Sequence, residues 1–348
     1  MKGILLVNLG SPNSPNTKDV KRYLGEFLMD ERVIDLPYLF RFLLVKGIIV
    51  NTRSKKSAAA YRKIWTPEGS PLIVNSEKLS NKLKKTSAYP VSLAMRYGEM
   101  SIKKGLSELH EKGVTEVFMI PLYPQHAMST TETVVEKTKE MVKTHFPSIR
   151  IDVLPAFYND IDYLNSISNQ IESHLKETRP QMFVFSYHGL PERHIKKTDI
   201  TQSHCMLNNS CCTTPSKAHE FCYRHQAFKS TEEIAKRLNL KKGEYVTTFQ
   251  SRLGNDPWLK PYTDATLVEL AKNNQKNIAV VTPSFVSDCL ETLEEMNIEN
   301  RDSFMNAGGE SYQYIPCLND DSNWVNVLNK WSNDWASGNH KKEYLELK

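Results

Sequence analysis

Several familiar signatures are missing from this 348-residue sequence. No G-x-G-x-x-G turn follows an apolar strand and no G-x-x-x-x-G-K-[ST] loop occurs, so dinucleotides and nucleoside triphosphates lack their usual backbone cradle. The G-x-S-x-G turn that presents a nucleophilic serine in many hydrolases is absent as well. The common nucleotide-dependent enzymes and serine hydrolases are therefore not expected.

The sequence also lacks a membrane-spanning run and an export signal. The longest apolar stretch, residues 33–50, is interrupted by Asp35, Pro37 and two basic residues, whereas a spanning helix needs about 20 apolar residues. The apolar run near the N-terminus stops at Asn8 and is too short for a secretory signal. We expect a cytoplasmic protein in which residues 33–50 form an amphipathic helix, packed on the core or lying peripherally on the inner membrane face.

A dominant charge of either sign is lacking too. The chain has 45 Lys and Arg against 40 Asp and Glu, a net charge of +5 spread along its length, so nucleic acid is not an expected partner. What the chain does have is length, and 348 residues exceed one ordinary core. Two domains are expected.

Eight apolar segments of strand length alternate with segments of helix length. They are residues 3–9, 91–97, 115–122, 150–155, 182–188, 244–250, 277–283 and 311–316. Strands this uniformly apolar are typical of parallel sheets covered by helices on both faces. The halves also share an apolar strand that leads into a Gly-x-Pro turn, in LLVNLGSP and FVFSYHGLP. We predict an α/β protein with two similar Rossmann-like domains, each a doubly wound, parallel four-stranded sheet.

The expected N-terminal domain covers residues 1–163, and its segment at about 28–60 would form a lip of the ligand cleft. The expected C-terminal domain, residues 164–348, would carry a Cys-rich insert at residues 203–225 and a C-terminal helix. Ligands of such sheets lie beyond the carboxyl ends of the strands. Residues at the strand ends of both domains, such as His188, should therefore face one cleft.

Three glutamates follow the strand at residues 277–283. Glu291, Glu295 and Glu299 are four residues apart, which stacks them on one face of a helix, where like charges cost stability unless a cation lies between them. A solvated acidic face and a structural histidine are the plain interpretations. A row of carboxylates with the His188 imidazole opposite would instead suit a divalent metal that is held weakly and handed on.

Five motifs of the chain, in order, resemble those of the ferrochelatases, which insert ferrous iron into a porphyrin. They are VNLGSP (7–12), YPQHAMSTT (123–131), FSYHGLPERH (185–194), FQSRLGNDPWLKPYT (249–263) and FVSDCLETLEEM (285–296). The resemblance, to the single-chain bacterial type, extends to about residue 316. It implies two Rossmann-like domains with the porphyrin between them, which agrees with the internal repeat.

The resemblance also implies roles for individual residues. His188 matches the cleft histidine and Glu291 the carboxylate facing it, so these two are the predicted catalytic and metal-contacting groups, while Glu295 and Glu299 match acids that lead metal or protons. The positions that match the lining of the macrocycle are Leu9, Arg96, Tyr97, Tyr123, Trp258 and Phe285. Aliphatic and aromatic walls suit a flat apolar ring, and a cation such as Arg96 suits its propionates.

The expected reaction is the terminal step of haem biosynthesis, with Fe²⁺ and protoporphyrin IX as substrates and protohaem and two protons as products. His188 would act as the base, although the reverse assignment with Glu291 is viable. A porphyrin or haem carrier without catalysis is one alternative, but it has no use for the glutamates. A cobalt or nickel chelatase and a coproporphyrin enzyme are others, and Leu9 stands where coproporphyrin enzymes tend to have tyrosine.

Four of the six cysteines lie in the insert, namely Cys205, Cys211, Cys212 and Cys222. Four thiolates suit either tetrahedral zinc or a [2Fe–2S] cluster, and their spacing does not choose. Some bacterial ferrochelatases have such an insert just after the histidine motif, so the resemblance implies a [2Fe–2S] cluster, with zinc or free thiols as alternatives. Cys289 stands where some relatives have a histidine, and we expect it to be a small buried residue.

Overall fold

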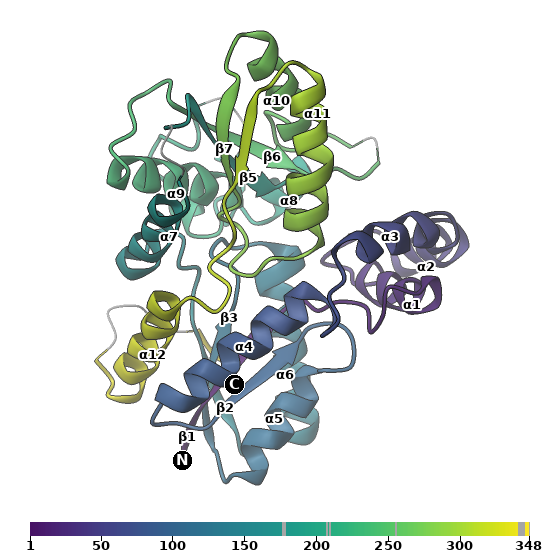
Figure 1. Cartoon of the computed structure of the whole chain (residues 1–348). Helices are drawn as coiled ribbons and strands as arrows, with labels where there is room; N and C mark the ends of the chain where they lie inside the picture. The colour runs from purple at the N-terminus through teal and green to yellow at the C-terminus, as the bar shows by residue number, and fades with distance from the viewer. Residues whose placement is uncertain (176–178, 207, 209, 255, 340–344, 348) are drawn as a thin grey trace. The chain divides into compact units, whose positions relative to one another are not determined.

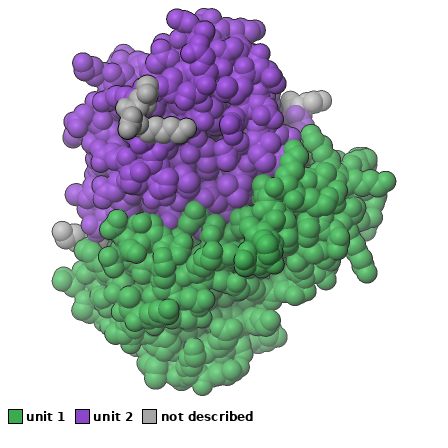
Figure 2. Space-filling view, in the orientation of Figure 1, with its two compact units in different colours: residues 1–123, 128–155, 319–348 green, residues 124–127, 156–318 purple. Residues whose placement is uncertain are grey.

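The computed structural model of the chain describes residues 1–175, 179–206, 208, 210–254, 256–339 and 345–347. The chain forms two compact units, shown as a cartoon in Figure 1 and as coloured surfaces in Figure 2. Unit 1 comprises residues 1–123, 128–155 and 319–348, and unit 2 comprises residues 124–127 and 156–318. Each unit contains its own β-sheet, which confirms the predicted α/β class with two sheets.

The sheet of unit 1 has the strand order β2-β1-β3-β4-β9. Its strands are β1 (Lys2–Asn8), β2 (Val91–Met95), β3 (Glu116–Pro121), β4 (Arg150–Val153) and β9 (Leu345–Leu347). The first four are parallel, as predicted, whereas β9 pairs antiparallel with β4. This edge strand was not predicted, because three residues are too few to show an alternating or apolar pattern.

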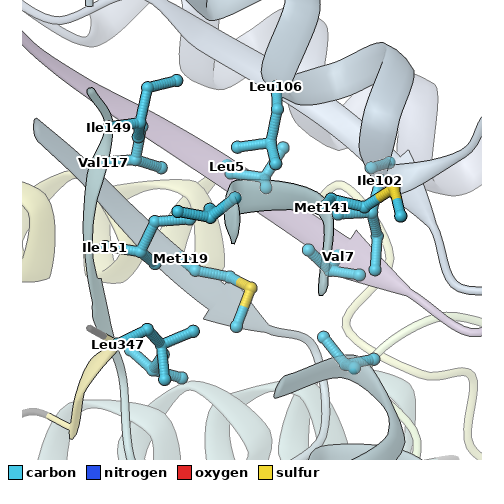
Figure 3. Packing of buried hydrophobic residues seen from close by; sticks show 14 of the residues in the cluster. Leu5, Val7, Ile102, Leu106, Val117, Met119, Met141, Ile149, Ile151 and Leu347 are labelled. Carbon is cyan, nitrogen blue, oxygen red and sulfur yellow. The ribbon is translucent and has the colours of Figure 1, made fainter. Parts of the chain in front are cut away.

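Helices α5 (Ile102–Glu111) and α6 (Thr133–His145) of unit 1 pack on the face of the sheet that carries Leu5 and Met119. Because alternate residues of a strand point to opposite faces, these side chains share a core with Leu106 and Met141 (Figure 3). The helices and π-helices (η) of unit 1 are α1 (Thr17–Phe27), α2 (Tyr38–Phe42), η1 (Leu43–Ile49), α3 (Val50–Ile64), α4 (Pro71–Thr86), α5 (Ile102–Glu111), η2 (Met128–Glu132), α6 (Thr133–His145) and α12 (Ser322–Ala336).

The C-terminal helix α12 belongs to unit 1, so its predicted place in the second domain is wrong. Trp335 of α12 stacks on Phe118 of β3 with ring centroids 5.3 Å apart, and its indole N–H donates to the Asp152 carboxylate at 2.7 Å. Helix α12 also contacts α4, so the two helices lie together over the same unit (Figure 1). Nearness in sequence misled the prediction, because the apolar face of α12 matches a sheet far away in the chain.

The sheet of unit 2 has the order β6-β5-β7-β8 and is parallel throughout. The elements of unit 2 are α7 (Ile161–His174), β5 (Met182–His188), α8 (Glu192–Lys197), the 3₁₀-helix η3 (Lys217–Glu220), α9 (Tyr223–Arg237), β6 (Tyr245–Gln250), α10 (Thr263–Lys272), β7 (Asn277–Val281), the π-helix η4 (Glu291–Asn300), α11 (Arg301–Asn306) and β8 (Ser311–Tyr314). In both units the strand that comes first in sequence is second in the sheet and the next strand lies at its edge. This shared order confirms the predicted repeat.

The predicted lip, residues 28–60, forms α2, η1 and most of α3, which pack with α1 around a small core that includes Leu28, Val45 and Val50. The helical prediction for residues 33–50 is correct, but much of this segment faces outward. Its exposed large apolar side chains are Leu36, Tyr38, Leu39, Phe40, Phe42, Leu43 and Ile48. None of the described helices is long and apolar enough to cross a membrane. The position of the segment beside a cleft stays a prediction.

Candidate active site

His188 is the last residue of β5, where the register places it beside Gln250 of β6. Ser186 lies two residues earlier, on the same face of the strand, and its hydroxyl contacts the sulfur of Met296 in η4. His188 therefore points to the face of the sheet that η4 covers. Parallel strands end at one edge, so the residues after β5, β6 and β7 meet there.

The hydrogen bonds of His188 decide which ring nitrogen is basic. Its Nδ1 lies 2.7 Å from the carbonyl oxygen of Gly189, which only accepts, so Nδ1 carries the proton of the neutral ring. The Nε2 lone pair is then free for a proton or a metal. The backbone N–H of His188 donates to the hydroxyl of Ser284, and Tyr223 donates to its carbonyl. These contacts hold the imidazole in one orientation.

Gly189 explains why the strand ends in a His-Gly turn. A Cβ atom at this position would lie 2.7 Å from the carbonyl oxygen of Gln250 and 3.3 Å from the Trp258 ring, closer than side chains tolerate. The half-buried Trp258 is also held by its indole N–H, which donates to the carbonyl of Leu253 at 3.0 Å. Phe285 lies on another side of His188, with ring centroids 6.3 Å apart. Trp258 and Phe285 are thus both near the histidine, and their contact with a macrocycle stays a prediction.

The glutamates lie on a π-helix, η4, where the spacing had suggested an α-helix. A π-helix closes i to i+5 hydrogen bonds, so its turn is wider, and residues four apart remain near neighbours on one face. Glu291 and Glu295 are half-buried and Glu299 is exposed. The row of glutamates therefore runs from the solvent-exposed Glu299 to the half-buried Glu295 and Glu291. Extended π-helices are rare and are often associated with functional sites.

Glu295 is the most firmly held of the three. Its carboxylate accepts from the backbone N–H of Ser251 at 2.8 Å and from the Ser251 hydroxyl, and the Gln250 amide lies 3.4 Å away. Burial raises the pKa of the Glu295 carboxyl; Ser251 and the charge of His188 oppose this shift, and the charge of Glu291 adds to it. His188, Glu291 and Glu295 are therefore close enough to influence one another.

Ser251 and Gln250 are site residues that were not singled out in the sequence, although both lie in a quoted motif. Ser251 has φ +56°, the left-handed region that non-glycine residues seldom occupy. This conformation directs both its N–H and its hydroxyl to Glu295. Gln250 donates to the backbone carbonyl of Glu291 at 2.9 Å. A polar pair at the end of an apolar strand, in register with His188, is the signal that could have found them.

Cys289 is buried, as expected. Its thiol hydrogen-bonds to the Glu291 carboxylate, and burial, then the charge of Glu291, raises its pKa well above the usual value. The backbone N–H of Cys289 is bonded to the hydroxyl of Thr292 at 2.9 Å, which also donates to the buried Asp288. The residue thus fills a small space at the start of η4 and stays protonated.

Arg96, the predicted cation for the propionates, is paired within unit 1. Its Nη2 lies 2.5 Å from the Asp30 carboxylate and its Nε donates to the Thr133 hydroxyl at 2.6 Å. Asp30 also accepts from the Tyr97 hydroxyl at 3.0 Å and from Thr133 at 2.5 Å. Burial alone would raise the pKa of Asp30, but the bonds from Thr133 and the Arg32 backbone N–H and the charge of Arg96 lower it. Arg96 is therefore neutralised within unit 1.

The other predicted porphyrin contacts of unit 1 are mostly covered. Tyr97 is 1% exposed and Tyr123 is 8% exposed, whereas Leu9 is half-buried against the core. The Tyr123 hydroxyl makes no hydrogen bond within the described part of the chain, and burial raises its pKa well above the usual value. A buried hydroxyl without a partner is costly and needs an explanation.

The four cysteines of the insert come together as a chain of thiols. Cys205 and Cys212 each lie near Cys222, and Cys211 lies near Cys212, close enough to influence one another's pKa. Cys205, Cys211 and Cys222 are buried, and none of the four is in a disulfide. Burial raises the pKa of Cys205 to about 11. The bond to Cys222, followed by burial, raises the pKa of Cys212 still further.

Polar groups surround these thiols. The imidazoles of His204 and His219 donate to the carbonyl of Cys211, at 2.7 and 2.9 Å, and that of His225 donates to the carbonyl of Cys212 at 2.7 Å. Within the described ranges, no three His, Cys, Asp or Glu side chains are grouped so that they could hold a single metal ion. The metal-contacting roles of His188 and the glutamates thus stay predictions, as does the cluster.

Two solved structures share this fold. SirB from Bacillus subtilis with Fe³⁺ superimposes with a TM-score of 0.55 at 12% identity, covering 97% of this chain and 96% of that one. The sirohydrochlorin chelatase SirB from Bacillus subtilis subspecies spizizenii in complex with cobalt gives 0.55 at 11%, with the same coverage. The chain therefore shares its two-domain fold with these SirB structures.

Sequence comparison identifies the family. The ferrochelatase family model matches residues 1–334. The ferrochelatase of Opitutus terrae is 45% identical over 343 residues, covering 98% of this chain and 99% of the relative. That of Pseudomonas savastanoi pv. phaseolicola is 45% identical, covering 94% and 96%, and that of Ectopseudomonas mendocina is 46% identical, covering 93% and 95%. The chain belongs to the ferrochelatase family, the lyases that insert ferrous iron into a porphyrin, and a non-catalytic carrier is not favoured.

Proposed function

We propose that the substrate is protoporphyrin IX, that the product is protohaem, and that His188 is the base of the reaction. The observation that carries this proposal is the bond from Nδ1 of His188 to the Gly189 carbonyl, which leaves Nε2 unprotonated in the neutral ring. A free-base porphyrin must lose two pyrrole protons while iron binds, and a positioned imidazole with a free lone pair suits their removal. The Glu295 carboxyl lies near His188, whose charge opposes the rise in the pKa of Glu295 that burial causes.

The three glutamates of η4 form the route by which iron arrives or protons leave. Glu299 is exposed, and Glu295 and Glu291 are half-buried. Iron or protons would therefore pass between the solvent-exposed carboxylate and the two half-buried ones. Carboxylate oxygens bind ferrous iron with moderate strength, which suits a metal that is handed on. We assign Glu291 as the carboxylate that acts together with His188. Glu295, fixed by Ser251, is the middle step.

The macrocycle would contact Leu9, Trp258 and Phe285, the predicted wall residues that are half-buried. Arg96 would reach a propionate only by sharing its guanidinium with Asp30. Tyr97 and Tyr123 would act from behind this surface, because both are buried. The unpartnered Tyr123 hydroxyl is the one buried polar group of this set that a ligand would satisfy.

Iron insertion without oxygen, followed by the loss of porphyrin fluorescence, tests these roles. We expect the wild type to metallate protoporphyrin IX, and the His188→Ala and Glu291→Gln variants to bind it with turnover reduced at least about 100-fold, the usual worth of a general base. The exposed His145 on α6 provides the control, since His145→Ala should be fully active. A wild type that binds porphyrin and never metallates it would refute the proposal. A higher kcat/KM with coproporphyrin III would refute its substrate.

We further propose that the cysteine insert holds a [2Fe–2S] cluster. Such a cluster takes two thiolates on each of two irons, and the four thiols are near one another, with Cys222 beside both Cys205 and Cys212 and Cys211 beside Cys212. Zinc requires all four around one point. When bound, the cluster would supply one-electron redox chemistry, and the four cysteines would hold it. Iron and acid-labile sulfide, two of each per chain, with a visible absorption spectrum would support the cluster, and one zinc per chain would refute it.

Finally, we propose that the enzyme is cytoplasmic and touches an anionic membrane surface through residues 33–50. The exposed aromatic and aliphatic side chains of α2 and η1 lie close in sequence to exposed Arg53, Lys55 and Lys56 of α3. This pairing of apolar and basic groups is typical of interfacial helices. In flotation with phosphatidylglycerol vesicles, the Phe40→Ser variant should bind less than the wild type. Ile161→Ser, which changes an equally exposed residue of α7, should not. Absence of wild-type binding would end the proposal.

A further inference from the structure

We propose that Arg224 sets the reduction potential of the cysteine insert by donating hydrogen bonds to Cys211 and Cys212, so that the electron added on reduction resides at that end. This inference rests on the proposed [2Fe–2S] cluster. Arg224 is the second residue of α9, two positions after Cys222. It was not among the residues that the sequence motifs singled out.

The guanidinium of Arg224 contacts two sulfurs at once. Its Nη1 lies 3.2 Å from Sγ of Cys212 and 3.6 Å from Sγ of Cys211, both within range for a bond to sulfur. Its Cζ lies 5.1 Å from the centre of the Phe228 ring, one helical turn further along α9. This cation–π contact keeps the side chain against the thiols. The guanidinium is thus held between the two sulfurs and the Phe228 ring.

The opposite end of the thiol chain has the opposite charge. The buried carboxylate of Asp199 accepts the backbone N–H groups of Thr201, His204 and Cys205, each at 2.8 Å. These bonds hold the loop that carries Cys205. Cys205 thus has an anion beside it, whereas Cys211 and Cys212 have a cation.

This difference has a predictable electronic result. Hydrogen bonds to the ligand sulfurs and nearby charge set the potential of an iron–sulfur cluster. Reduction takes one electron from an external reductant and converts one of the two ferric ions to ferrous, with no bond made or broken. A cation stabilises the added negative charge, so Arg224 should raise the potential and favour the iron bound by Cys211 and Cys212.

The experiment is a redox titration of the reconstituted full-length protein with dithionite, followed by absorption and electron paramagnetic resonance. We expect Arg224→Gln to shift the midpoint to more negative potential and to change the g values of the reduced cluster. Arg224→Lys keeps the charge but loses the planar fork, and it should shift less. The control is Arg237→Gln, which removes another arginine of α9, paired with Glu233 and away from the thiols. It should leave the midpoint unchanged.

The outcomes separate this inference from the proposed cluster. A wild type that binds zinc or no metal refutes the cluster, and the role of Arg224 with it. A wild type with a cluster whose midpoint and g values are the same in Arg224→Gln refutes the role of Arg224 alone. If Arg224→Gln does not retain a cluster, Arg224→Met decides, because this variant keeps the bulk but removes the charge, and an unshifted midpoint with unchanged g values in it would also refute the role.

Discussion

The two units share one strand order, but the charged residues at their strand ends have different partners. In unit 1, Arg96 follows β2 and is paired with Asp30, while Tyr97 and Thr133 fill the remaining positions around that carboxylate. In unit 2, His188 ends β5 beside Glu295, whose partners Ser251 and Gln250 are uncharged. A neutralised pair stabilises a fold, whereas a half-buried acid near an imidazole stays available for protons and metal. The same scaffold thus holds a neutralised pair in one unit and the proposed reactive site in the other.

Gly189→Ala should have the largest effect on the reactive site of unit 2. A Cβ atom would lie 2.7 Å from the Gln250 carbonyl, so β6, Trp258 and the His188 turn must all shift. Overpacking of this kind costs about 1–3 kcal/mol, and displacement of the imidazole should lower kcat more than 100-fold, as general-base loss does. Thermal unfolding and iron insertion are the measurements.

The control is Gly47→Ala, where an added Cβ meets nothing within 4 Å. This variant should match the wild type in both assays. A fully active Gly189→Ala protein would show that the His188 turn tolerates movement, and would contradict its assigned role.

Asp30→Asn tests whether the hydrogen bonds and the ion pair around the Asp30 carboxylate stabilise unit 1. Losing the charge that Arg96 and two hydroxyls bind should cost about 3 kcal/mol at pH 7. Because the pKa of Asp30 is lowered in the folded state, its charge stabilises the fold above the unfolded pKa of about 3.9, and that contribution is lost as pH falls through the folded pKa.

The difference in Tm between wild type and Asp30→Asn should therefore be largest near neutrality and shrink below about pH 4. Calorimetry across this range measures it. A Tm difference that does not change with pH would mean that shape, rather than charge, explains the role of Asp30.

Ser251→Ala removes one of the two donors to Glu295 and leaves the backbone N–H in place. A hydrogen bond to a charged group is worth about 1.5–3 kcal/mol, so iron insertion should slow by roughly 10-fold or more. Ser210→Ala, in an exposed turn of the insert, is the control. Unchanged turnover of Ser251→Ala would show that Glu295 needs no fixed position.

Glu299→Gln should have the smallest effect. Glu299 is the exposed end of the row, and an isolated exposed charge contributes up to roughly 1 kcal/mol. We expect KM for iron to rise by no more than about fivefold, with kcat unchanged. A large fall in kcat would place Glu299 nearer the chemistry than its exposure indicates.

All eight parallel strands and the positions of His188 and the glutamates were predictable from the sequence, because apolar runs and strand-end motifs are local patterns. What escaped prediction depends on distant partners. The pairing of Arg96 with Asp30 joins residues 66 positions apart, and the place of α12 depends on Phe118 of β3. The π-helical form of η4 escaped as well, since a spacing of four residues suits both helix types.

Because α12 packs on unit 1, the two units are completed in a fixed order during synthesis on the ribosome. Unit 2 comes almost entirely from one continuous stretch, residues 156–318, whereas unit 1 also needs residues 319–348. Until α12 has emerged, Phe118 and the sheet around it lie uncovered, although β1 to β4 were synthesised long before. The unit that starts first is therefore completed last, and the nascent chain must keep an apolar sheet face from aggregating while unit 2 folds.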